Sequence, residues 1–523
     1  MTSKLPWVAM VITLLVAINA PIARAQTDWT TFGFDAQRTG YNPQETALSA
    51  QNVSNLHLNW NVDLGGQMST EPTFLSGVSV PQPDGSVVQT DLVYVGTQLG
   101  VFYALDAASG TIIWNVQLPT SVACPDIFPG DVVGIIGAPT IDRANGRIFV
   151  VAGDDTLHAL DPATGNELAG YPLLLVEPAN APPHTIVWSS PTYNPLNNSL
   201  YIATAGLCES PYHGQLMRVD VTPGSTPSVA GRWFPSGSNS GPDGGGIWGW
   251  GGASLGPAGH ALFVATGNIF ADPENSLFGD HIVRLNLNLL PVDSDAPDIG
   301  LSQGQTDVDF GSTPVLYQPP GCPPQLAVEN KSGRLFIYNR DAVGGGPMQV
   351  IMITQFDSDF IGDVAYDPVL NQIYVSNPRD DGVGTYFHGL IALAPKPTAP
   401  SRPSGSGRSA SMPQAPCRHP RSRPTAWSIL LRASAHKPLL WMRPPGRFFG
   451  VVGLSSANPS SRHRRLSTAS SLSQLMTTRS MLSVRDAGSI PAPDSCARRL
   501  RAFPGCHRAR TPSGSARLTA SAD

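Results

Sequence analysis

The sequence predicts an all-β protein assembled from repeated sheets of short strands. Gly (52) and Pro (50) are abundant among its 523 residues, and charged residues make up only 14%. Many tight turns between strands produce such a composition, and long surface helices do not. A disordered chain can also be rich in Gly and Pro, but 41% hydrophobic residues are enough to build a core. The strongest indication is an internal repeat.

The repeat is clearest in residues 92–114 (LVYVGTQLGVFYALDAASGTIIW) and 147–167 (RIFVVAGDDTLHALDPATGNE). Each copy has an apolar strand, a polar or Gly-containing turn, and a second strand that ends in Ala-Leu-Asp. A Gly follows four residues after the Asp. This pair suits a tight turn, because Asp accepts backbone N–H bonds and Gly tolerates positive φ. We expect the next strand to leave that turn, as residues 111–114 do.

Weaker copies occupy residues 199–220, 261–286, 325–340 and 372–394. The positions equivalent to the turn Asp lie 55, 59, 66, 53 and 55 residues apart, at Asp106, Asp161, Asp220, Asn286, Asn339 and Ala394. A small residue followed by Pro and Thr or Val precedes several copies, at 138–140, 190–192 and 313–315. Each period therefore has room for about four short strands, which is one propeller blade. Six repeats predict six blades.

These motifs resemble the pyrroloquinoline-quinone (PQQ) repeat of quinoprotein alcohol dehydrogenases and of related non-enzymatic propellers. The resemblance covers roughly residues 28–395 and includes Trp29, the segment 39–43 (TGYNP) and Trp60 near the N-terminus. It implies a ring of eight four-stranded blades, of which this chain holds about six. In that family the N-terminal strand completes the last blade, which this chain lacks according to the repeat count.

Four segments match the family's cofactor site in order and approximate spacing. They are 247–250 (IWGW), 265–268 (ATGN), 308–310 (VDF) and 330–333 (NKSG). The resemblance implies that Trp248 stacks under PQQ, that Asn268 binds Ca²⁺, that Asp309 is the catalytic base and that Lys331 contacts the quinone oxygens. Glu209 is a looser match to the Ca²⁺-binding Glu. Carboxylate and amide oxygens suit a hard cation, and a hydroxyl substrate needs a base.

Each of these residues also has a structural interpretation. Trp248 could pack between blades, Asn268 could be a turn residue, and Asp309 could cap a strand. Lys331 and Glu209 could be solvated loop charges. The sequence also departs from the dehydrogenases, because it has no adjacent Cys pair to lie above PQQ and no C-x-x-C-H haem motif. Electrons would then need an external acceptor.

The two ends of the chain differ from its body. Residues 1–25 have the pattern of a secretory signal peptide: Lys4, an apolar run over 7–20, and Ala-Arg-Ala before Gln26. Residues 26–395 hold the repeats. From 396 to 523 the chain is rich in Arg, Ser and Pro, and residues 401–523 contain 20 Lys and Arg against 3 acidic residues, without turn-delimited strands. We expect this tail to be disordered or irregular, and we attribute it to a frameshift near residue 395. Translating the other two reading frames of the DNA beyond that codon tests the idea.

The sequence therefore predicts an exported quinoprotein-type dehydrogenase, periplasmic or secreted, with PQQ and Ca²⁺. Its substrate would be an alcohol or polyol, and no membrane span would remain after signal cleavage. Two alternatives stay open: a non-catalytic propeller that serves as a binding or assembly scaffold for envelope proteins, and a truncated inactive product. We expect no nucleic-acid partner, because residues 1–400 carry 13 basic and 35 acidic side chains.

Overall fold

The computed structural model describes residues 27–122, 129–176, 185–206, 211–270, 277–300, 308–355, 360–382 and 384–395, and two short strands beyond them. No α-helix occurs in these residues, and none of their helical turns could cross a bilayer. Short 3-10 helices interrupt the turns, at η2 (Val53–Asn55), η3 (Pro129–Asp131), η4 (Arg143–Asn145) and η6 (Val343–Gly345).

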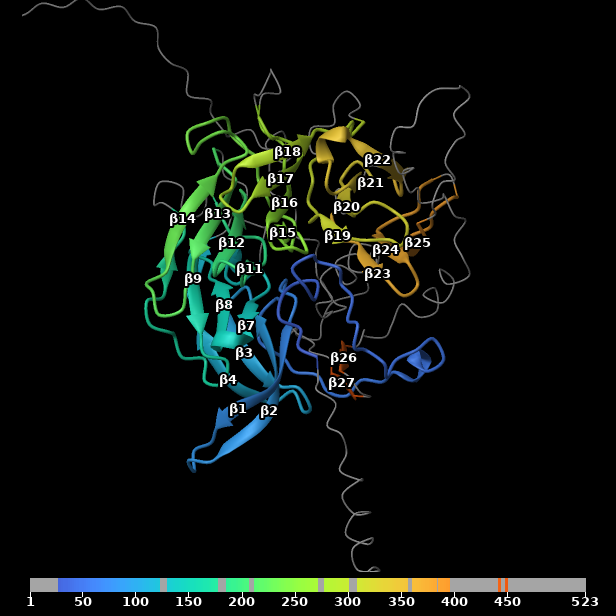
Figure 1. The fold of residues 1–523 in the computed structure, drawn as a ribbon. Coiled ribbons are helices and arrows are strands. Elements are labelled where there is room, and N and C mark those ends of the chain that lie inside the picture. Colours follow the sequence, from blue (N-terminus) through green and yellow to red (C-terminus); the bar gives the residue numbers. More distant parts are fainter. Residues whose placement is uncertain are drawn as a thin grey trace, which may run out of the picture.

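Six antiparallel sheets follow one another in chain order around a common centre, as blades 1 to 6 of a propeller (Figure 1). Blades 1 to 5 have four strands each, and the described part of blade 6 has three. Blade 1 contains β1 (Thr73–Pro81), β2 (Val87–Gly96), β3 (Val101–Asp106) and β4 (Ile112–Gln117), and blade 2 contains β7 (Thr140–Asp142), β8 (Arg147–Val151), β9 (Thr156–Leu160) and β10 (Leu173–Leu174). Blade 3 contains β11 (Thr192–Asn194), β12 (Ser199–Thr204), β13 (Gln215–Asp220) and β14 (Ser228–Trp233), and blade 4 contains β15 (Ser254–Leu255), β16 (Ala261–Ala265), β17 (Ile282–Asn286) and β18 (Pro291–Asp295). Blade 5 contains β19 (Val315–Tyr317), β20 (Gln325–Asn330), β21 (Arg334–Asn339) and β22 (Pro347–Met352), and blade 6 contains β23 (Ala365–Asp367), β24 (Gln372–Asn377) and β25 (Gly389–Leu393).

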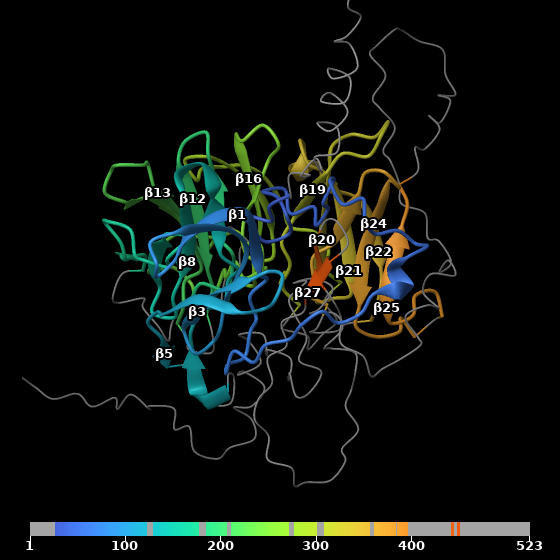
Figure 2. The same ribbon diagram turned by 90° about the horizontal axis from the view of Figure 1, so that it is seen from below.

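A separate short hairpin pairs β5 (Ser121–Val122) with β6 (Val132–Val133) and projects away from the blades (Figure 2). In the tail, the described residues form one more hairpin, β26 (Trp441–Arg443) with β27 (Arg447–Phe449). The rest of the tail, for which we expect a disordered or irregular chain, lies outside the described residues. The predicted signal peptide lies outside the described residues.

The repeat positions coincide with the blades, as the sequence predicted. The turn Asp or its equivalent ends the third strand of every blade or directly follows it. Asp106 Oδ1 accepts the backbone N–H groups two and three residues later, at 2.9 and 2.7 Å, and Asp161 makes the same two bonds at 2.9 Å each. Gly110 and Gly165 have φ of 74° and 73°. Local turn chemistry therefore shapes the exit from the third strand in these two blades.

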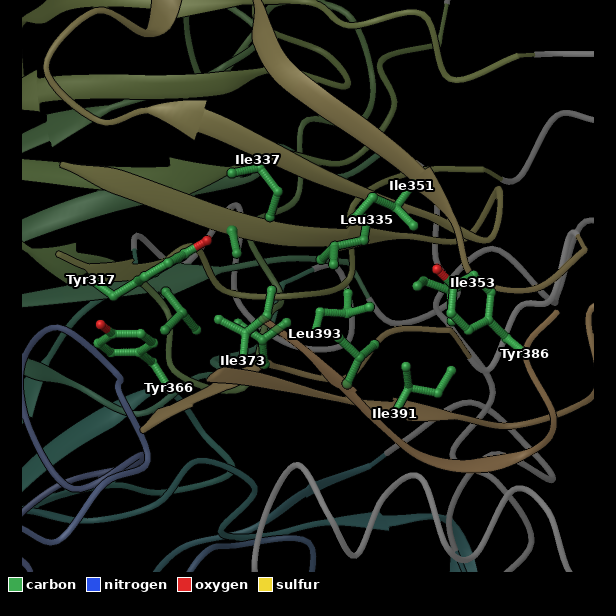
Figure 3. Close-up of a cluster of buried hydrophobic side chains, with 14 of the residues drawn as sticks. Tyr317, Leu335, Ile337, Ile351, Ile353, Tyr366, Ile373, Tyr386, Ile391 and Leu393 are labelled. Carbon is green, nitrogen blue, oxygen red and sulfur yellow. The ribbon is translucent and has the colours of Figure 1, made fainter. Parts of the chain in front are cut away.

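The blades pack through apolar side chains of facing sheets. Between blades 5 and 6, fifteen buried hydrophobic residues form one cluster, and Figure 3 shows side chains from the two sheets pointing toward one another. Tyr317 and Tyr366 stack with ring centroids 4.8 Å apart. Successive residues of β20 face opposite neighbouring blades. Ala327 belongs to this cluster, and Val328 belongs to the cluster between blades 4 and 5.

The segment from Trp29 to Thr39, here called the hub segment, touches the first strand of every blade. Backbone hydrogen bonds of 2.7 to 3.0 Å join it to five of these strands, at Phe74, Ile141, Leu255, Leu316 and Tyr366. The sixth link is a side chain: Arg38 Nη2 donates to Thr192 Oγ1 of β11 at 2.6 Å. The first strands therefore line the centre, and the hub segment ties them together.

Arg38 is the buried charge of the hub segment, with only 1% of its surface exposed. Its Nη1 also donates to Thr31 Oγ1 and to the Phe32 carbonyl, at 2.7 and 3.0 Å. Burial lowers its pKa to about 10, against the attraction of Asp35, Asp363 and Glu71. Glu71 and Asp363 hold the same place in blades 1 and 6, two residues before β1 and β23 respectively, where the other blades carry small residues. The hub thus has one guanidinium facing two equivalent carboxylates.

Candidate active site

The predicted site residues lie on blades 4 and 5, in connections that turn toward the centre. Trp248 lies in the connection that leads to β15, and Asp309 lies in the one that leads to β19. Asn268 follows β16, and Lys331 is in the turn between β20 and β21. Glu209 lies outside the described residues.

Three of these residues are in direct contact. Lys331 Nζ lies 2.7 Å from Asp309 Oδ1, and Trp248 Nε1 donates to Asp309 Oδ2 at 2.9 Å. The same ammonium group sits over the Trp248 ring, 4.8 Å from its centroid. Trp248, Asp309 and Lys331 thus meet in one cluster, which we call the Asp309 group. The solvated-charge interpretation of Lys331 is wrong, because its side chain is fully buried (0% exposed).

Burying such a pair is costly. Desolvation of two charges can exceed their mutual attraction, so a buried ion pair is weak support for stability alone. Charged groups held in a buried, convergent arrangement are more often found where a protein binds or transforms a ligand. The cation over the indole adds an attraction of about 0.5–2 kcal/mol. The Asp309 group is therefore the candidate functional site.

Two glycines make room for this group. A Cβ at Gly311 would lie 2.2 Å from Cη2 of Trp248, and a Cβ at Gly267 would lie 2.9 Å from Asp309 Oδ2. Contacts below 3.0 Å are not tolerated, so only glycine lets the backbone approach the indole and the carboxylate this closely. Gly267 is part of the ATGN segment, whereas Gly311 carries no local sequence signal, because its role depends on a side chain 63 positions away.

Asn268 lies beside the Asp309 group. Gly267, next to it in the chain, abuts Asp309, and the Asn268 backbone carbonyl accepts the N–H of Gly245 at 2.8 Å. Within the described residues, no group of three His, Cys, Asp or Glu side chains is arranged to hold a metal ion. The Asn268 amide and the Asp309 carboxylate are oxygen donors of the kind that a hard cation prefers.

Trp250 and His281 have structural surroundings. Trp250 belongs to an apolar cluster at the centre that includes Phe32, Trp188 and Ile361. His281 Nδ1 lies at hydrogen-bonding distance from the Gly279 carbonyl, and its backbone N–H donates to Thr266 Oγ1 at 3.0 Å. Trp248 itself belongs to the same apolar cluster as Trp250, whereas the hydrogen bonds of His281 stay within its own connection.

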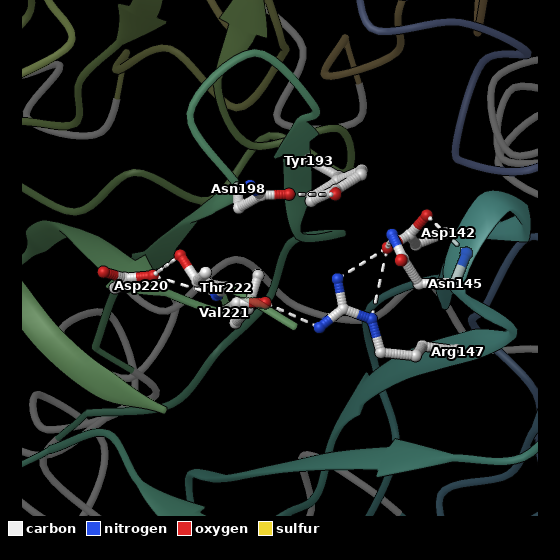
Figure 4. Close-up of polar contacts among 8 residues, drawn as sticks. All are labelled: Asp142, Asn145, Arg147, Tyr193, Asn198, Asp220, Val221 and Thr222. Atoms are coloured by element: carbon white, nitrogen blue, oxygen red, sulfur yellow. Dashed lines mark hydrogen bonds and ion pairs between the residues drawn. The ribbon is translucent and has the colours of Figure 1, made fainter. Parts of the chain in front are cut away.

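A second buried ion pair provides a comparison. Arg147 Nη2 lies 2.6 Å from Asp142 Oδ2, and Arg147 Nη1 donates to the Val221 carbonyl of the next blade (Figure 4). Burial raises the pKa of Asp142, but hydrogen bonds from Arg147 and Asn145 outweigh it and hold that pKa below its usual value. This pair joins blades 2 and 3, and its guanidinium carbon lies 5.0 Å from the centroid of the Phe149 ring, so a buried ion pair beside an aromatic ring serves here as a structural link.

Comparison with known proteins identifies the repeat. Residues 29–173 match the family described as the glucose/ethanol/alcohol dehydrogenase β-propeller domain. Residues 29–173 carry PQQ-type propeller repeats. The matched region is blade 1, blade 2 and the hub segment, and the other four blades of the PQQ-repeat propeller repeat the same architecture.

Curated relatives of this PQQ-repeat propeller are quinone-linked dehydrogenases. The quinohemoprotein alcohol dehydrogenase of Comamonas testosteroni is 30% identical over 156 residues, 29% of this chain and 19% of that protein. The dehydrogenase subunit of the quinone-type alcohol dehydrogenase of Gluconobacter oxydans (strain 621H) is 27% identical over 142 residues, 26% of this chain and 16% of its own length. The chain therefore aligns with less than a fifth of each relative.

A solved structure supports the fold over a longer stretch. A quinohemoprotein alcohol dehydrogenase from Pseudomonas putida HK5 superposes with a TM-score of 0.50 at 17% identity, covering 72% of this chain and 59% of that one. The likeness concerns the propeller alone.

Proposed function

We propose that this chain is an exported quinoprotein-type dehydrogenase that binds PQQ and Ca²⁺ and oxidises an alcohol or polyol. The observation that carries the proposal is the buried contact of Lys331, Asp309 and Trp248, three positions matched to the family's cofactor site. Cys322 is disulfide-bonded, which supports an oxidising compartment outside the cytoplasm.

The residues present fit these groups. An indole face suits a planar aromatic cofactor, and a buried ammonium suits its anionic oxygens. Trp248 and Lys331 would hold PQQ, and Asn268, with Glu209, would hold Ca²⁺. PQQ, when bound, supplies the acceptor for the two electrons taken from the substrate, and Ca²⁺ polarises it. An external carrier would then remove the electrons.

Asp309 would accept the hydroxyl proton of the alcohol. Its two oxygens are held by different donors, Oδ1 by Lys331 and Oδ2 by the Trp248 N–H. Both donors fix the orientation of the carboxylate, which a general base requires. Lys331 would also offset negative charge that develops next to the indole face.

The experiment loads the purified protein with PQQ and CaCl₂ and follows quinone absorbance and dye-linked alcohol oxidation. Asp309→Asn should keep PQQ binding and lose about 10²–10⁴-fold in rate. Asp142→Asn is the matched control, since Asp142 is also a buried partner of a buried cation and should leave both readouts intact. Absence of PQQ uptake by the parent protein, under conditions where it is folded, would contradict the proposal and favour a non-catalytic scaffold.

A further inference from the structure

Two segments that are distant in sequence carry the charged partners of the Asp309 group. The connection 308–312 carries Asp309, and the end of β20 with its turn carries Lys331. They run beside each other, and one backbone bond joins them at the pair itself, from the Lys331 N–H to the Asp309 carbonyl at 3.3 Å. That bond is long, so it is a weak constraint on its own.

Side chains on either side of the pair complete the connection. Asn330 Nδ2 donates to the Val308 carbonyl at 2.7 Å, and Asn330 Oδ1 accepts the Ser332 N–H at 2.9 Å. One amide therefore holds the residue before Asp309 and the residue after Lys331. Asn330 is fully buried, so no water competes for these bonds.

Ser312 provides the second clamp, on the other side of Asp309. Its hydroxyl donates to the Glu329 carbonyl at 2.7 Å and accepts the Glu329 N–H at 2.8 Å. The hydroxyl thus replaces the pair of backbone bonds that a neighbouring strand would make. Ser312 is 1% exposed. Asn330 and Ser312 together fix the register of the two segments at both ends of the ion pair.

We propose that Asn330 and Ser312 are positioning residues that set the contact between Asp309 and Lys331. The expected effect on rate rests on the proposed function, whereas the expected effect on the contact between Asp309 and Lys331 does not. A catalytic carboxylate displaced by about 1 Å can lose about 10²-fold in rate, so a clamp on its backbone is as important as its own partners.

The chain offers a matched control for Asn330. Asn194 at the end of β11 is also fully buried, donates to the Gly259 carbonyl at 3.0 Å and accepts the Leu196 N–H at 3.0 Å. Asn194→Ala and Asn330→Ala therefore remove the same kinds of hydrogen bond, one far from the Asp309 group and one beside it. For Ser312, the Ala variant removes the clamp and the Thr variant keeps the hydroxyl.

The test compares crystal structures and kinetics of these variants. We expect Asn330→Ala and Ser312→Ala to lengthen the 2.7 Å contact between Lys331 Nζ and Asp309 Oδ1, and Asn194→Ala to leave it unchanged. In PQQ-loaded protein, the two site variants should lose at least about tenfold in kcat with KM within about twofold. Ser312→Thr should restore most of that loss.

An unchanged ion pair and an unchanged kcat in both site variants, with melting temperatures lowered as in Asn194→Ala, would show a purely structural role and overturn the inference. If the parent protein oxidises no alcohol, the proposed function fails while the crystal structures still decide the positioning role. If Asn330→Ala does not fold, Ser312→Ala carries the same geometric test.

Discussion

The indole of Trp114 lies against Gly165, at the turn of the following blade. A Cβ built at Gly165 would come within 2.6 Å of the ring, and Trp114 Nε1 donates to the Pro162 carbonyl of that turn at 3.1 Å. Trp60 has the same relation to Gly110, one blade earlier, at 2.4 Å. Two requirements therefore select Gly at this repeat position in blades 1 and 2: a left-handed backbone and the close approach of a Trp ring.

Gly165→Ala should destabilise the protein by about 2–4 kcal/mol, because the strain of positive φ adds to a steric clash with Trp114. Gly224→Ala separates the two effects. Gly224 is the equivalent turn residue of blade 3, with φ of 80° and nothing within 4 Å of its would-be Cβ. Gly224→Ala should lower the free energy of unfolding by only about 1 kcal/mol. Urea unfolding monitored by circular dichroism gives both values, and equal losses would remove the ring contact from the explanation.

Lys331→Met should destabilise the fold by about 3–5 kcal/mol, because it leaves the Asp309 carboxylate buried without its cation. The double variant Lys331→Met/Asp309→Asn should recover much of that loss, since no buried charge remains. Thermal unfolding of the two single variants and the double variant forms a cycle that isolates the coupling. Additive losses would indicate that the two side chains do not interact.

The stability of the protein should fall as pH rises from about 5 to 8. Burial raises the pKa of Asp363 to about 7, and burial next to Asp363 raises the pKa of Glu329 well above its usual value. Arg38, which faces Asp363, Glu71 and Asp35, opposes only part of this effect at Asp363. The two carboxyl groups therefore bind protons more tightly in the folded state than in the unfolded state. Their contribution to stability is fully present below the unfolded pKa of about 4 and is lost as the pH rises past about 7.

Glu329→Gln and Asp363→Asn should flatten this dependence. The wild-type urea midpoint should decrease between pH 5 and pH 8, and each variant should show a smaller decrease and a higher midpoint at pH 8. A wild-type midpoint that rises over this range would contradict the assignment. Asp84→Asn is the control, because the Asp84 pKa is lowered by the Ser86 hydroxyl rather than raised by burial.

Arg38→Met should destabilise the whole propeller rather than one blade. It removes hydrogen bonds to Thr31, Phe32 and Thr192 and takes away the cation that attracts Glu71 and Asp363. Arg38→Lys should restore little, because an ammonium cannot reach both sides as the guanidinium fork does. Arg143→Met, which breaks the half-exposed ion pair with Asp28, should cost less than about 1 kcal/mol. Calorimetry that shows similar losses for both variants would contradict the hub role of Arg38.

Local chemistry explains which parts of the fold could be predicted from the sequence. The blade period appears in one recurring turn, with Asp and Gly in blades 1 to 3 and weaker equivalents at Asn286, Asn339 and Ala394, so six turns predicted six blades. The Asp309 group was predicted as a set of family positions, and its three-way contact is a finding of the structure, while the roles of its members remain predictions. The hub was missed because Arg38, Glu71 and Asp363 share no local pattern. The signal lay in Glu71-Pro72-Thr73, a copy of the small-Pro-Thr motif with a carboxylate in place of the small residue.

The hub segment is synthesised before the blades but completes its contacts after them. Trp29 to Thr39 leave the ribosome before any blade does, yet the Thr39 carbonyl receives its bond from Tyr366, more than 300 residues later. Trp29 and Thr30 can bond to blades 1 and 2 early, but the bonds of this stretch to all six first strands are complete only when the sixth sheet has folded. Until then part of the segment lacks its final neighbours, and the partly folded chain is exposed to misassociation.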